Sequence, residues 1–106
     1  MAVDEQFRLQ SSISDGCVVT IYVTGDVDRA TAPEIEDVLT HSPEIRELIV
    51  DLSQCSFIDS SGINALVVCR RWLSPDATMR LVGVAPNVEK VLRIAGVQHY
   101  LETGNP

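Results

Sequence analysis

Two adjacent serines follow a single aspartate in the segment FIDSSG, residues 57–62. The segment lies between two apolar stretches, where a buried strand is expected to pass into a helix. A hydroxyl at a helix N-terminus can accept a hydrogen bond from a free backbone N–H, so capping is the simplest interpretation. One serine is enough for a cap. The other would then be available for chemistry done by it or on it.

A second polar segment, GDVD at residues 25–28, follows an apolar strand that we expect to end at Thr24. The longer segment DVDRAT resembles the DxDx[TV] nucleophile loop of aspartate-dependent phosphatases, but its threonine comes one position too late. FIDSSG lacks the glycine before the serine that the G-x-S-x-G elbow of serine hydrolases requires. Neither His41 nor His99 is placed to suggest a general base. We therefore expect no enzyme, and interpret these segments as a surface that another protein recognises.

The three cysteines, Cys17, Cys55 and Cys69, are widely and irregularly spaced, without a CxxC pair. The ligand spacing of a zinc site is missing, so we expect neither a metal nor a cofactor. Buried thiols are the favoured interpretation, and a redox pair stays open. We expect Cys69 to be buried on a helix. Cys55, in a predicted turn before the serines, should be the most exposed thiol.

The sequence has 106 residues and a formal net charge of −7. Phosphate contacts in nucleic acids need a surplus of Lys and Arg, so this charge argues against nucleic-acid binding. The first residues do not form a basic-then-apolar leader, and no apolar run approaches the length of a membrane span. We expect a single domain, residues 1–106, that lies in the cytosol and does not bind membranes.

The hydrophobic pattern predicts strands that alternate with helices. Strands are expected at residues 7–13, 17–23, 48–52 and 79–84, with a short one near 99–101, and a turn at Asp15-Gly16. Helices are expected from a Thr31/Glu34 capping box to about Ser42, from Ser60 or Ser61 to near Leu73, and from Pro86 to Gly96. The run at 48–52 is typical of a strand covered on both faces.

This order of elements predicts an α/β fold, with a mixed, mostly parallel β-sheet, βαβ crossovers and helices packed against the sheet. The loops after two parallel strands emerge at the same edge of the sheet. Residues 25–28 should therefore lie beside residues 57–62. In open α/β sheets this carboxyl edge is where ligands and partners usually dock.

The second predicted helix has one broad apolar face, made by Ala65, Val68, Cys69, Trp72 and Leu73, with Leu66 at its margin. Asn64 and Arg71 fall on the opposite side, and Ile63 and Val67 lie near that polar side. Apolar side chains beside polar ones, as Ile63 and Val67 lie beside Asn64 and Arg71, are typical of a protein-binding patch. The alternative is that another element covers Ile63 and Val67, and we favour the patch.

Three segments resemble the STAS domains of bacterial anti-sigma factor antagonists: TGDVD, LIVDLSQCSFIDSSG with the helix after it, and NVEKVLRIAGV. The resemblance covers about Phe7 to Glu102 and implies a STAS-like core of about residues 7–102. In that family the first serine after the aspartate is phosphorylated by the anti-sigma factor, which is itself a kinase. That position is Ser60 here, with Ser61 as the runner-up.

The resemblance implies that the unphosphorylated chain binds an anti-sigma factor and releases a sigma factor, and that phosphorylation ends this binding. A serine phosphatase is the further partner implied. Asp28 matches the aspartate of the family's G-[DE]-[LIV]-D loop at the partner surface, and Asn64 stands where many relatives carry glycine. The expected partner-binding residues are Gly25, Asp26, Asp28, Asp59, Ser61, Gly62, Ile63, Asn64, Val67 and Arg71.

A second interpretation is a STAS-domain accessory subunit of a lipid transporter, or another protein-binding STAS module without sigma control. The DSSG form of the serine segment favours the antagonist.

Overall fold

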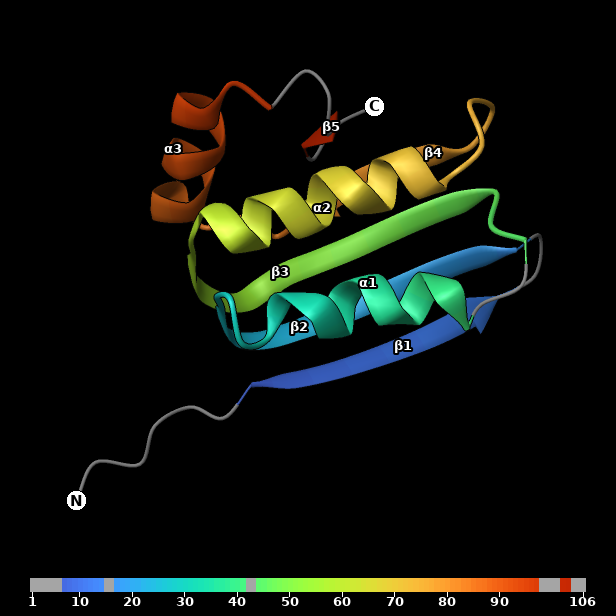
Figure 1. The fold of residues 1–106 in the computed structure, drawn as a ribbon, viewed down its shortest axis with the longest axis horizontal. Coiled ribbons are helices and arrows are strands. Elements are labelled where there is room, and N and C mark those ends of the chain that lie inside the picture. The colour runs from blue at the N-terminus through green and yellow to red at the C-terminus, as the bar shows by residue number, and fades with distance from the viewer. Residues whose placement is uncertain (1–6, 15–16, 42–43, 98–101, 104–106) are drawn as a thin grey trace.

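The computed structural model describes residues 7–14, 17–41, 44–97 and 102–103. The elements within these residues are β1 (Arg8–Ser14), β2 (Val18–Val27), α1 (Ala32–Thr40), β3 (Glu47–Ile58), α2 (Ser60–Trp72), β4 (Thr78–Val82), α3 (Pro86–Ala95) and β5 (Glu102–Thr103). The strands form one sheet in the order β1-β2-β3-β4-β5, as Figure 1 shows. β1 pairs antiparallel to β2 and the remaining pairs are parallel. The predicted α/β fold with a mixed, mostly parallel sheet is confirmed.

Most predicted elements occur where the hydrophobic pattern placed them. The hairpin partners β1 and β2 pair as expected, while the predicted turn at residues 15–16 and the predicted strand at 99–101 lie outside the described residues. The last described strand is β5, just beyond that prediction. α3 ends as predicted, because Gly96 adopts a left-handed backbone conformation with φ of 75°.

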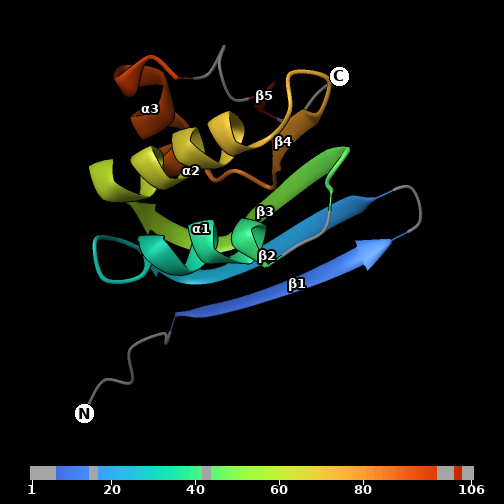
Figure 2. The same ribbon diagram turned by 45° about the vertical axis from the view of Figure 1, so that its right-hand side comes forward.

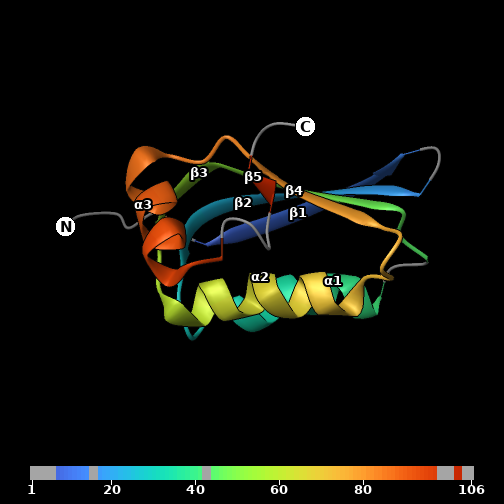
Figure 3. The same ribbon diagram turned by 90° about the horizontal axis from the view of Figure 1, so that it is seen from above.

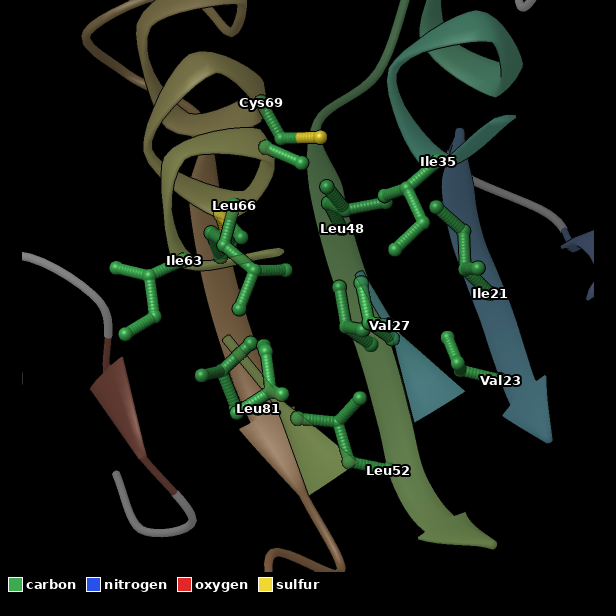
Figure 4. Packing of buried hydrophobic residues seen from close by; sticks show 14 of the residues in the cluster. Ile21, Val23, Val27, Ile35, Leu48, Leu52, Ile63, Leu66, Cys69 and Leu81 are labelled. Carbon is green, nitrogen blue, oxygen red and sulfur yellow. The ribbon is translucent and has the colours of Figure 1, made fainter. Parts of the chain in front are cut away.

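Helices α1 and α2 lie side by side on one face of the sheet, and Figures 2 and 3 show this from two further directions. α3 lies at the end of the sheet near the start of α2. Strand residues that face α1 and α2 are buried, including Ile21, Leu48 and Val50, and Figure 4 shows part of this core. Alternate residues such as Ile49 are only partly covered. The prediction that the strand at 48–52 is covered on both faces is therefore wrong, because both helices pack on the same side.

β2 and β3 are both longer than predicted. β2 was expected to end at Thr24 but continues to Val27, because its last residues pair with the end of β3 beyond two register irregularities. Beyond them Asp26 pairs with Phe57, and Val27 pairs with Ile58. The backbone N–H of Asp59 then donates to the carbonyl of Val27 at 3.1 Å. This confirms that the loops after β2 and β3 meet at one edge of the sheet. None of the described helices combines the length and the apolar character needed to cross a bilayer.

Candidate functional site

Asp59, and not a serine, caps the start of α2. Its extended backbone, with φ of −109° and ψ of −170°, directs one carboxylate oxygen at two backbone N–H groups. The N–H of Ser61 donates to this Oδ1 at 2.9 Å and that of Gly62 at 3.1 Å. The prediction that a serine side chain forms the cap is wrong, because Ser60 and Ser61 already lie inside the helix. Neither hydroxyl makes a hydrogen bond to the part of the chain that the structure describes.

Replacing Asp59 with alanine should lower the free energy of unfolding by about 1 kcal/mol, because two N–H groups at the helix start lose their acceptor. Urea unfolding followed by circular dichroism measures this loss. Asp59→Ser, which supplies a shorter capping oxygen, should recover most of the stability. Equal stability of the wild type and Asp59→Ala would contradict the assignment of the cap.

The loop after β2 is held by its own side chains. The carboxylate of Asp28 accepts hydrogen bonds from the N–H groups of Ala30 at 3.0 Å and Thr31 at 3.1 Å. The Thr31 hydroxyl accepts from the N–H of Asp28 and lies 3.0 Å from the carbonyl oxygen of Asp26, to which it can donate. Thr31 is the N-cap residue of α1, but its side chain makes no capping bond. The predicted capping box with Glu34 is therefore wrong, because the hydroxyl serves the loop instead.

The two polar segments are joined by direct contacts. The Ser56 hydroxyl donates to the carboxylate of Asp26 at 3.2 Å, and the side-chain amide of Asn87 donates to the Ser56 carbonyl at 2.8 Å. Phe57, which follows Ser56 in the chain, is 48% exposed. Gly25 is buried. Ser56, Phe57 and Asn87 were not among the predicted site residues. No local motif marks Ser56 and Phe57, which reach this edge through the pairing of β3 with β2, or Asn87, which reaches it from α3.

Two adjoining surface grooves contain the serines. The first is lined by Asp28, Arg29, Ala30, Asp59, Ser60 and Ser61. The second is lined by Arg29, Ala32, Pro33, Glu36, Ser60, Ser61 and Asn64. The structure thus brings the predicted residues Asp28, Asp59 and Asn64 together around the two serines. Arg29 lines both grooves and was not among the predicted site residues. A larger groove, whose lining includes Glu44, Arg46 and Asp76, contains none of the predicted site residues.

The buried face of α2 differs from the predicted one. It consists of Gly62, Ile63, Ala65, Leu66 and Cys69. Ile63 is only 8% exposed and Val67 packs partly buried against the core, whereas Trp72 is 59% exposed. The face is centred near Leu66, and at 100° per residue Trp72 lies about 120° away from it. The prediction that Ile63 belongs to an exposed patch is therefore wrong. The alternative, that another element covers Ile63, is correct. Arg71 is exposed in the last turn.

Cys55 is buried, at 2% exposure, so the prediction that it is the most exposed thiol is wrong. β3 continues past this residue instead of turning, which directs the side chain into the core. Its thiol lies 3.3 Å from the carbonyl oxygen of Phe57. Cys69 is buried as predicted, and burial, with a smaller contribution from Glu36, raises the pKa of its thiol to about 12. The Cys69 thiol is therefore protonated at neutral pH.

The fold and the serine-bearing edge of the sheet define a known class of domain. The STAS domain family matches residues 8–105, and the chain belongs to this family. An anti-sigma-B factor antagonist of Staphylococcus aureus (strain NCTC 8325 / PS 47) is 30% identical over 81 residues, which cover 74% of this chain and 75% of that protein.

Solved structures that share the fold include two antagonist structures. An anti-sigma factor antagonist from Mycobacterium paratuberculosis superposes with a TM-score of 0.83 at 21% identity, over 95% of this chain and 87% of that one. The Bacillus cell fate determinant SpoIIAA in its phosphorylated form superposes with a TM-score of 0.69 at 19% identity, over 92% of each chain.

Proposed function

We propose that this chain is an anti-sigma factor antagonist controlled by phosphorylation of Ser60. In its unphosphorylated form it binds an anti-sigma factor in the cytoplasm, and so releases a sigma factor. The anti-sigma factor is also the kinase that phosphorylates Ser60, and a serine phosphatase restores the binding form. The relative from Staphylococcus aureus, itself named an antagonist, supports the role, and the phosphorylated form of SpoIIAA supports the modification.

The observation that carries this proposal is the state of the Ser60 hydroxyl. Ser60 is exposed in the first turn of α2, and Asp59 supplies the helix cap in its place. The hydroxyl can therefore be modified without the loss of a hydrogen bond that stabilises the described fold. Ser61 lines the same grooves but is half-buried. Because Ser60 is more exposed than Ser61, Ser60 is favoured as the acceptor.

The partner surface that we propose surrounds this serine. Asp26, Asp28, Asp59, Ser61 and Asn64 are at least partly exposed at this edge, and form its centre. Arg71 and the half-buried Val67 would extend the surface along α2. Gly25, Gly62 and Ile63 are buried, and so act through the shape of the backbone and the packing beneath it. A chain that works in this way is a binding protein and not an enzyme.

Replacing Ser60 with alanine should abolish phosphate incorporation and leave partner binding close to intact. After incubation with a candidate anti-sigma kinase and ATP, the intact mass of the wild type should rise by about 80 Da, and that of Ser60→Ala should not change, because the acceptor oxygen is absent. Ser61→Ala is the matched control and should accept phosphate as the wild type does. Loss of the label in Ser61→Ala alone would move the acceptor by one residue. Tight binding without any incorporation into the wild type would favour a STAS module without this switch.

A further inference from the structure

Arg29 is a cation placed beside the proposed phosphate acceptor. It follows Asp28 in the loop after β2, and it lines both of the grooves that contain Ser60. Among the described residues that line these grooves it is the one basic side chain. It is exposed, and it makes no hydrogen bond or ion pair within the described parts of the chain. Its guanidinium is therefore available to a ligand that enters the groove.

We propose that Arg29 binds the phosphate group of phosphorylated Ser60 within the same chain. This inference rests on the proposed function, since it concerns the form that the kinase produces. An arginine guanidinium presents a planar set of N–H donors that matches phosphate oxygens in a bidentate pair. A phosphate at this position would otherwise face mainly carboxylates.

The charges around Ser60 show why such a cation is needed. Asp28 and Asp59 line the first groove, and Glu36 lines the second. The carboxylates of Asp28 and Asp59 are fixed by backbone N–H groups, so they cannot turn away from an added phosphate. Phosphorylation adds about −1.5 to −2 charges at pH 7. Arg29 offsets this repulsion at the point where it arises.

The pairing also has a consequence for the partner. The bare hydroxyl and the unpaired guanidinium form one surface in the unphosphorylated chain. In the phosphorylated chain an ion pair between the phosphate and Arg29 replaces both. Arg29 can then no longer bind an acidic group of the partner. The modification would therefore remove an attractive contact in addition to adding a repulsive one.

The test places phosphoserine at position 60 by genetic encoding, which needs no kinase. The ³¹P chemical shift of the phosphoprotein is then followed against pH for the wild type, Arg29→Ala, Arg29→Lys and Arg71→Ala. Arg71 is an exposed arginine about 16 Å along α2 from Ser60, and so is the matched control. Removal of Arg29 should raise the titration midpoint by about 0.5 pH unit or more, because a nearby cation favours the dianion.

Arg29→Lys should fall between the wild type and Arg29→Ala, since it keeps the charge but not the bidentate geometry. Arg71→Ala should leave the midpoint unchanged. An unchanged midpoint in Arg29→Ala, or an equal shift in Arg71→Ala, would overturn the pairing. Because the phosphate is installed without a kinase, this result is independent of whether a kinase labels Ser60, and the two proposals can fail separately.

Discussion

Replacing Gly62 with valine is expected to lower the free energy of unfolding by about 3 kcal/mol, and replacing it with alanine by about 1–2 kcal/mol. A Cβ atom at this position would lie 2.5 Å from Cγ1 of Ile58 and 2.7 Å from Cγ1 of Val27. Both neighbours are buried and β-branched, so neither can rotate away without disturbing the core. The close approach of α2 to the end of the sheet therefore requires glycine.

Helix propensity acts in the other direction but is smaller. Alanine is favoured over glycine within a helix by about 1 kcal/mol, while overpacking a core costs about 1–3 kcal/mol. Urea unfolding of both variants measures the balance. Asn64→Ala, an exposed position two residues further along α2, is the matched control and should stay within about 0.5 kcal/mol of the wild type. If Gly62→Ala had wild-type stability but bound the partner more weakly, Gly62 would be a partner contact and not a packing requirement.

The order of the elements was predictable because each strand and helix has its own hydrophobic period. The end of β3 was not predictable in this way. The segment SQCSF has the polar residues of a turn, but the chain stays extended through it, with Cys55 buried and Ser56 and Phe57 exposed. Pairing with the bulged end of β2 decides this conformation, and that pairing joins residues about thirty positions apart.

The position of the site was predictable from topology alone, because two parallel strands deliver their loops to one edge. Its details were not. Asp59 and Ser60 are both good capping residues, and a shift of one position decides which side chain is left exposed. The face of α2 was misjudged because apolar side chains surround most of the helix. Only its packing against the sheet shows that Ile63 is covered and Trp72 is not.

Replacing Ser60 with glutamate should weaken binding of the anti-sigma factor by roughly 100-fold, or about 3 kcal/mol, because like charges brought together in an interface cost several kcal/mol. The added carboxylate would share its groove with Asp28 and Asp59, which are held in place by backbone N–H groups. A bound partner would exclude the water that screens this repulsion, so the repulsion costs more in the complex than in the free chain. Isothermal titration calorimetry with the purified anti-sigma factor measures the change in Kd.

Two controls separate a local switch from a general effect. Ser74→Glu adds the same charge at an exposed position beyond the other end of α2, and should leave Kd nearly unchanged. Thermal unfolding of Ser60→Glu should show no loss of stability, since an acidic side chain in the first turn interacts favourably with the helix dipole. Weak binding by an equally stable Ser60→Glu protein would therefore reflect the interface itself. Unchanged affinity of Ser60→Glu would contradict a charge switch at Ser60. If Ser74→Glu weakened binding equally, the cause would be the net charge of the chain and not the position of the added charge.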